Sequence, residues 1–163
     1  MPSRLPGEPD TLAPDQALEG AVEHKTMLFD RRRTTPGAAR SFVAETLTQW
    51  GRTERLDDIR LCISELATNA ILHGAPAGGQ VLVRVELHAT VLRIEVHDGG
   101  NGTPIKREAR STDAEGRGLL LVSAVADHWG VEERHGPGKC VWAAFHHSTV
   151  PTCWRRPIPR RSR

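Results

Sequence analysis

The sequence predicts an α+β fold, a two-layer α/β sandwich in which helices cover one face of a mostly antiparallel sheet. Three observations predict it. Residues 36–73 carry two consecutive helical apolar patterns, residues 81–96 carry two strand patterns separated by only a few residues, and residues 116–145 carry a third helix followed by two short strands. At 163 residues, the chain suits one domain with tails.

The first part of the chain predicts an edge strand and two helices. The strand is a short apolar run at 26–29, and Pro36 then opens a helix that Gly51 ends. A second helix is expected over 56–73. Apolar residues recur at helical spacing in both, and those of the second form a stripe that should be buried: Ile59, Cys62, Ile63, Leu66, Ala67 and Ala70.

The second part predicts two hairpins around a loop and a helix. Apolar and polar residues alternate over 81–87 and 92–96, as in half-buried strands of an antiparallel hairpin. The turn DGGNG at 98–102 leads into an exposed loop at 103–115 and a helix at 116–127. Strands are expected at 129–133 and 140–145, joined by the turn HGPG.

Composition predicts a domain at 24–147, between a flexible leader (1–23) and a basic, disordered tail (148–163). No stretch is long and apolar enough to span a membrane, and no signal peptide is seen, so the cytoplasm is the expected location. Three cysteines without a CxxC pair indicate neither a disulfide framework nor a zinc site. The five arginines of the tail leave nucleic-acid binding as an alternative that is not favoured.

Glu65 and Asn69 are the first candidate functional pair. Four residues apart, they share a helix face offset from the buried stripe. Asn is a mediocre helix former, which favours a tertiary or functional reason for its place there. The alternative is an ordinary solvated polar face.

Two glycine clusters extend this pattern. Asp98 ends a strand, where its carboxylate could accept a hydrogen bond from an exocyclic amine such as that of adenine, and Gly100 and Gly102 allow close backbone approach. The run Gly116-Arg117-Gly118 stands at the expected helix start, where free N–H groups suit phosphate. Taken separately, the first cluster could be an ordinary turn and the second a hinge. The sequence lacks a complete P-loop, GxGxxG or protein-kinase motif set.

Together and in this order, the motifs resemble those of the GHKL ATPase superfamily, whose core is the Bergerat fold. The resemblance is closest to its single-domain anti-sigma-factor serine kinases and actinobacterial regulators of that type. It covers roughly residues 24–146 and rests on SELATNAILHG, VHDGGNGTP, GRGLLLVSAVADHWGV and GKCVWAAF.

The resemblance implies ATP and Mg²⁺ as cofactors. It implies that Asn69 holds the Mg²⁺, that Glu65 is the general base, that Asp98 recognises adenine and that residues 103–115 form the ATP lid. The remaining nucleotide-binding residues that it implies are His73, Gly100, Gly102, Gly116, Arg117, Gly118, Leu119 and Cys140. At Cys140 the family usually has a Thr that supports the adenine aspartate, and Cys is a weaker donor and acceptor.

The function implied is an ATP-dependent protein serine/threonine kinase that phosphorylates a STAS-domain anti-sigma-factor antagonist and sequesters a sigma factor. The family often dimerises, so a homodimer is an open expectation. The absence of a phosphoacceptor histidine on a dimerisation helix pair argues against a complete histidine kinase. A non-catalytic module that binds ATP or only partners is the alternative.

Overall fold

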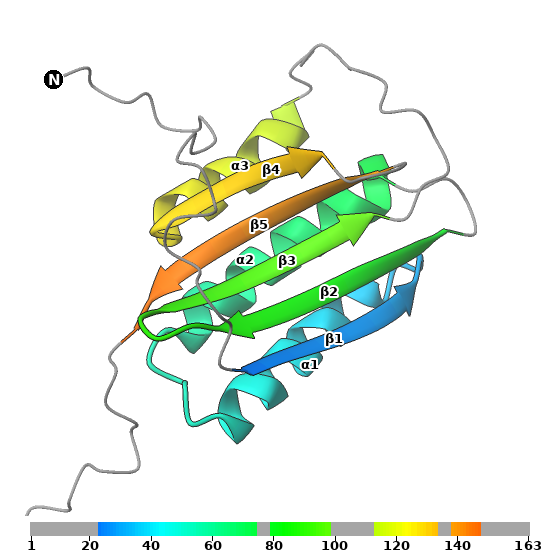
Figure 1. Ribbon diagram of the computed structural model, residues 1–163. Helices are drawn as coiled ribbons and strands as arrows, with labels where there is room; N and C mark the ends of the chain where they lie inside the picture. The colour runs from blue at the N-terminus through cyan, green and yellow to red at the C-terminus, as the bar shows by residue number, and fades with distance from the viewer. Residues whose placement is uncertain (1–22, 75–78, 99–112, 134–137, 148–163) are drawn as a thin grey trace, which may run out of the picture.

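The computed structural model describes residues 23–74, 79–98, 113–133 and 138–147, with five antiparallel strands in the order β1-β2-β3-β5-β4. Helices cover one face of this sheet (Figure 1), which confirms the predicted α+β sandwich and its edge strand. The expected leader and tail lie outside the described residues, except for Glu23. The elements are β1 (Glu23–Asp30), α1 (Thr35–Gln49), α2 (Leu56–Asn69), η1 (Ala70–Gly74), β2 (Gln80–Leu87), β3 (Val91–Asp98), α3 (Asp113–Val125), β4 (His128–Glu133) and β5 (Lys139–His146).

The hydrophobic core lies between the sheet and the helix layer. α2 occupies the middle of that layer, between α1 and α3 (Figure 1). Every member of the predicted stripe of α2 is at most 6% exposed, which confirms the pattern. From the sheet, the alternate residues that meet the helices are Val81, Val83, Val85, Leu87, Leu92, Ile94 and Val96. No described helix is long and apolar enough to cross a membrane.

The second and third helices have boundaries that differ from the expected ones. α2 ends as an α-helix at Asn69, and a π-helical turn, η1, follows where the α-helix was expected to continue to His73. The guanidinium of Arg31 donates to the Ile71 carbonyl at 2.7 Å, which binds one carbonyl of this wider turn. α3 begins at Asp113, three residues before the expected start, because acidic residues in 113–115 suit a first helical turn.

Arg55 fixes the C-terminal end of α3 to the rest of the domain. It lies just before α2, and its Nη1 is 2.5 Å from Oδ2 of Asp127, while its Nη2 donates to the Val125 carbonyl at 2.5 Å. The guanidinium also lies 5.2 Å from the ring centroid of Phe145 on β5. One side chain therefore joins α2, α3 and the sheet.

The sheet face away from the helices carries a buried charged cluster. Arg93 is 4% and Glu95 7% exposed, although the alternation predicted only half-buried strands. Their side chains pair at 2.7 Å, and Arg93 stacks 4.5 Å from the Trp142 ring centroid, so these long side chains cover one another. Burial alone would raise the pKa of Glu95, but the hydrogen bond with His97 and the charge of Arg93 together hold it below its usual value.

Candidate functional site

Glu65 and Asn69 converge on one point of the neighbouring helix. A Cβ built on Gly118 of α3 would lie 2.8 Å from Oε2 of Glu65, 3.6 Å from Oδ1 of Asn69 and 3.7 Å from its Nδ2. Both side chains are half-buried and therefore leave α2 toward α3 rather than toward open solvent. The glycine lets the third helix approach a carboxylate and an amide that a larger residue would push apart.

The glycine-rich run lies inside α3 instead of at its start. Because α3 begins at Asp113, Gly118 is its sixth residue, and the amides of Arg117 and Gly118 fall beyond the first four N–H groups that a helix leaves unpaired. The expectation that this run opens the helix is therefore wrong. The side chain of Arg117 lies outside the described part, so its contact with phosphate stays a prediction, as does that of Gly116.

Asp98 lies at the end of β3 with its carboxylate held by the main chain. It is 5% exposed, and its Oδ1 accepts a 2.9 Å hydrogen bond from the backbone N–H of Lys139. A Cβ on Gly138 would lie 2.6 Å from Oδ1, and one on Gly74 would lie 2.7 Å from Oδ2. Two glycines and one amide therefore fix the orientation of this carboxylate.

These arrangements fit the groups that a nucleotide and its magnesium would bring. An oriented carboxylate beside two glycines suits a hydrogen bond from an amine donor on a flat ring, because neither glycine has a side chain that would cover it. The oxygens of Glu65 and Asn69, gathered at one point, are of the kind that Mg²⁺ prefers. The η1 turn joins the two arrangements, since it follows Asn69 directly and ends at Gly74 beside Asp98. A π-turn is frequent at functional sites.

The other predicted site residues are distributed around this site. His73 is exposed on η1, and Leu119 is half-buried against the core. Cys140 is 3% exposed and belongs to the cluster on the outer sheet face with Trp142. Gly100 and Gly102 lie outside the described residues, as does nearly all of the expected lid. The nucleotide-binding roles of all these residues stay predictions.

Sequence reasoning missed the groups that hold Asp98. Gly74 only follows the second helix expected at 56–73, Gly138 is expected only as part of the turn HGPG, and the amide of Lys139 carries no side-chain signal. β3 and β5 are adjacent in the sheet with His97 opposite Cys140 in register. This long-range pairing brings residues 138 and 139 to Asp98. It could not be predicted from hairpins, which pair only strands that are neighbours in the sequence.

Comparison with known proteins identifies the family to which this chain belongs. Residues 30–145 match the family described as Histidine kinase-like ATPase domain. The chain therefore belongs to this family. The match spans the helices, the π-turn, Asp98 and nearly all of β5.

Individual proteins similar to this chain include anti-sigma F factors and a solved structure with RsbU and RsbW domains. The chain is 31% identical over 131 residues to an anti-sigma F factor of Clostridium acetobutylicum, covering 74% of this chain and 90% of the relative. It is 37% identical over 121 residues to an anti-sigma F factor of Bacillus licheniformis, covering 68% and 83%. Among solved structures, a Mycobacterium tuberculosis protein with RsbU and RsbW domains has a similar fold, with a TM-score of 0.58 and 20% identity. That match covers 76% of this chain and 31% of the solved one.

Proposed function

We propose that this protein is an ATP-dependent anti-sigma factor that phosphorylates a serine or threonine of a STAS-domain antagonist. The observation that carries the proposal is the convergence of Glu65 and Asn69 beside Gly118, within a chain that belongs to the histidine kinase-like ATPase family. A carboxylate and an amide at one point are what phosphoryl transfer needs to orient a hydroxyl and to hold a metal.

In this proposal, Asp98 accepts a hydrogen bond from the adenine amine, with its orientation set by the Lys139 amide. Asn69 holds the Mg²⁺ through its side-chain oxygen. When bound, ATP would supply the phosphoryl group, and Mg²⁺ would neutralise the negative charge of the phosphates. Glu65 then accepts the proton of the partner's hydroxyl, a general-base role typically worth about 10² to 10⁴ in rate. Gly118 keeps Glu65 in place by leaving room for its carboxylate.

The names of the relatives support one of the proposed partners, the sigma factor. Proteins called anti-sigma F factors are similar over two thirds or more of this chain, which supports a sigma factor as the sequestered partner. Phosphorylation of the antagonist would then release it and free this protein to hold the sigma factor. Dimerisation of this chain belongs to the same proposal, and sedimentation of the purified protein at several concentrations tests it separately.

The experiment is incubation of the full chain with γ-labelled ATP and Mg²⁺, with and without candidate STAS proteins. ATP binding and label transfer are measured in the same samples. Transfer to a serine or threonine of one STAS protein supports the kinase. ATP binding without transfer to any candidate contradicts it and favours the alternative, a module that regulates by occupancy. No ATP binding contradicts the kinase and leaves a module that binds only partners.

A further inference from the structure

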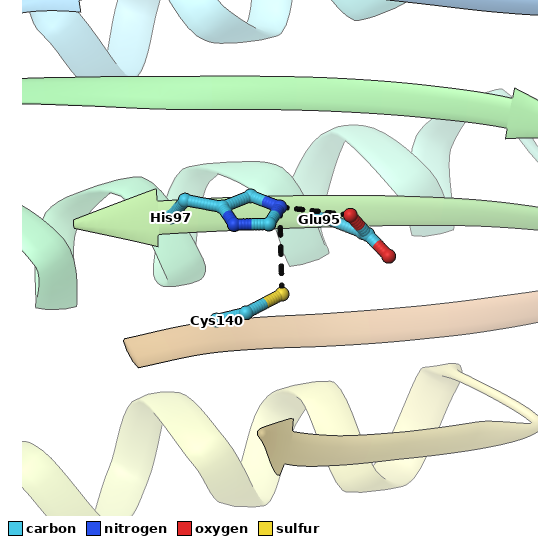
Figure 2. Close-up of side chains that lie close together, drawn as sticks. All are labelled: Glu95, His97 and Cys140. Atoms are coloured by element: carbon cyan, nitrogen blue, oxygen red, sulfur yellow. Dashed lines mark hydrogen bonds and ion pairs between the residues drawn. The ribbon is translucent and has the colours of Figure 1, made fainter. Parts of the chain in front are cut away.

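The outer face of the sheet brings three different metal-ligating side chains together, on the side away from Glu65 and Asn69 in the helix layer. Glu95 and His97 lie two residues apart on β3, so they share a face, and Cys140 lies opposite His97 on β5. Figure 2 shows the three side chains pointing toward one another across the two strands. The ring nitrogen, the carboxylate oxygen and the sulfur all lie within 4.8 Å of one another.

One ring nitrogen of His97 faces both of the other ligand atoms. Its Nε2 is 2.8 Å from Oε2 of Glu95 and also 3.6 Å from Sγ of Cys140. An imidazole nitrogen has either one N–H or one lone pair, directed along a single line. It can serve one of these neighbours well, but not both. A cation between the three atoms would use the nitrogen lone pair, the thiolate and the carboxylate together.

The separation between the His97 nitrogen and the Cys140 sulfur matches that in a tetrahedral zinc site. With Zn–N near 2.0 Å and Zn–S near 2.3 Å, a tetrahedral ion holds nitrogen and sulfur about 3.5 Å apart. The observed separation between Nε2 and Sγ is 3.6 Å. A carboxylate oxygen would lie roughly 3.4 Å from the nitrogen, so Glu95 would have to retreat by only about half an ångström from its present 2.8 Å contact.

Neighbouring charges support the carboxylate ligand. Arg93 pairs through its Nε with the other carboxylate oxygen, Oε1, at 2.7 Å, and through its Nη2 with Glu132 at 2.9 Å. This leaves Oε2 of Glu95 directed at His97, as outer partners orient metal ligands in known sites. One thiolate and one carboxylate balance the charge of a divalent ion, which matters because Glu95 and Cys140 are 7% and 3% exposed.

We propose that Glu95, His97 and Cys140 form a zinc site on the outer sheet face, with water as the fourth ligand. A sulfur, an imidazole and a carboxylate favour Zn²⁺ over Mg²⁺. The site is separate from the proposed magnesium ligand Asn69, which lies in the helix layer. Cys140 releases its thiol proton to solvent on binding. Motif spacing gave no sign of it, because the ligands come from two strands 43 residues apart.

The test uses the full, tag-free chain, stripped of metal under reducing conditions and titrated with Co²⁺ and then Zn²⁺. We expect one equivalent of Co²⁺ to give intense tetrahedral visible bands and a sulfur-to-metal charge-transfer band, both abolished by one equivalent of Zn²⁺. Cys140→Ala should lose the charge-transfer band and bind Zn²⁺ at least about 10-fold more weakly, as should His97→Gln. Cys62→Ala, which removes a thiol from the opposite, helix-facing core, should bind as wild type does.

Two outcomes overturn the proposal. One is a wild-type protein that binds less than one equivalent of Zn²⁺ in competition with a micromolar chelator. The other is a charge-transfer band that persists in Cys140→Ala, because the sulfur would then come from another cysteine. Circular dichroism of each variant establishes that it is folded. If Cys140→Ala does not fold, Cys140→Ser and His97→Gln carry the same comparison.

Discussion

A side chain at position 118 would collide with the carboxylate of Glu65. A Cβ built on Gly118 lies 2.8 Å from Oε2 of Glu65, closer than real Cβ contacts allow. The proposed general base and the third helix are therefore in contact at position 118, where an added methyl group would displace the Glu65 carboxylate. A substitution at position 118 on α3 should therefore alter the position of the Glu65 side chain on α2.

Gly118→Ala should slow any phosphoryl transfer, measured as label transfer, by displacing the Glu65 carboxylate. Its effect on stability should be small, because the displaced oxygen is the mobile end of a side chain and alanine favours the helix. Gly37→Ala is the matched control, because Gly37 also lies in a helix and its Cβ would meet only Arg40, at 3.6 Å. Alanine is the better helix former by up to about 1 kcal/mol, so the control should be neutral or stabilising. Urea unfolding measures both. Equal rates of label transfer in the two variants would contradict the contact between Gly118 and Glu65 as a determinant of the position of the carboxylate.

Gly138→Ala should weaken ATP binding as well as stability. Gly138 has φ of +104°, and a Cβ there would lie 2.2 Å from the Asp98 carbonyl oxygen and 2.6 Å from its Oδ1. Gly51→Ala is the control. It introduces the same kind of backbone strain, since Gly51 has φ of +66°, but no steric contact, because nothing lies within 4 Å of its Cβ position. We expect Gly51→Ala to cost about 1 to 2 kcal/mol while leaving the ATP dissociation constant unchanged. An equal loss of ATP affinity in both variants would argue against a role for Asp98.

Arg55→Met should lower the free energy of unfolding by about 1 to 3 kcal/mol, because it leaves Asp127 and the Val125 carbonyl without a charged donor that now joins them. The control is Arg32→Met, which removes an ion pair with Asp30 whose side chains are 73% and 60% exposed. Such exposed pairs contribute little, so the control should change stability by less than about 0.5 kcal/mol. Thermal and urea unfolding of the two variants decide the matter. An Arg55→Met variant that loses no more free energy of unfolding than Arg32→Met would contradict the stabilising role of Arg55.

Alkaline conditions should destabilise the protein through Cys62. Burial raises the pKa of this thiol to about 12, with the charge of Asp58 adding to the effect. The folded state keeps the proton that the unfolded chain releases above about pH 8.5, so this contribution to stability is complete below that pH and declines toward pH 12. The slope reaches about 1.4 kcal/mol per pH unit. Cys62→Ala should lack this component, and parallel stability curves for the two proteins between pH 8 and 10 would refute it.

The fold could be predicted from the sequence because its signals are local. The stripe of α2 and the alternation of β2 follow from residues a few positions apart, and both are confirmed, whereas β3 is buried on both faces instead of half-buried. The positions of Glu65 and Asn69 on one face follow in the same way. What they face could not be predicted, since the approach of Gly118 depends on how α3 packs against α2.

Two further features depended on the non-local pairing of β3 with β5. This pairing brings the Lys139 amide to Asp98 and places Cys140 opposite His97. Arg93 and Glu95 have the polar character of solvated strand residues, yet they are buried because Trp142 on β5 covers them. Sequence patterns along a single strand do not contain that information.

Glu65→Gln tests the central claim most directly. The substitution keeps the size of the side chain and its contact with Gly118 but removes the group that would accept a proton. We expect transfer of labelled phosphate to the STAS partner to fall about 10² to 10⁴-fold. ATP affinity should change by less than about threefold, and Glu45→Gln, an exposed glutamate on α1, should behave as wild type. Full-rate transfer by Glu65→Gln would contradict the account.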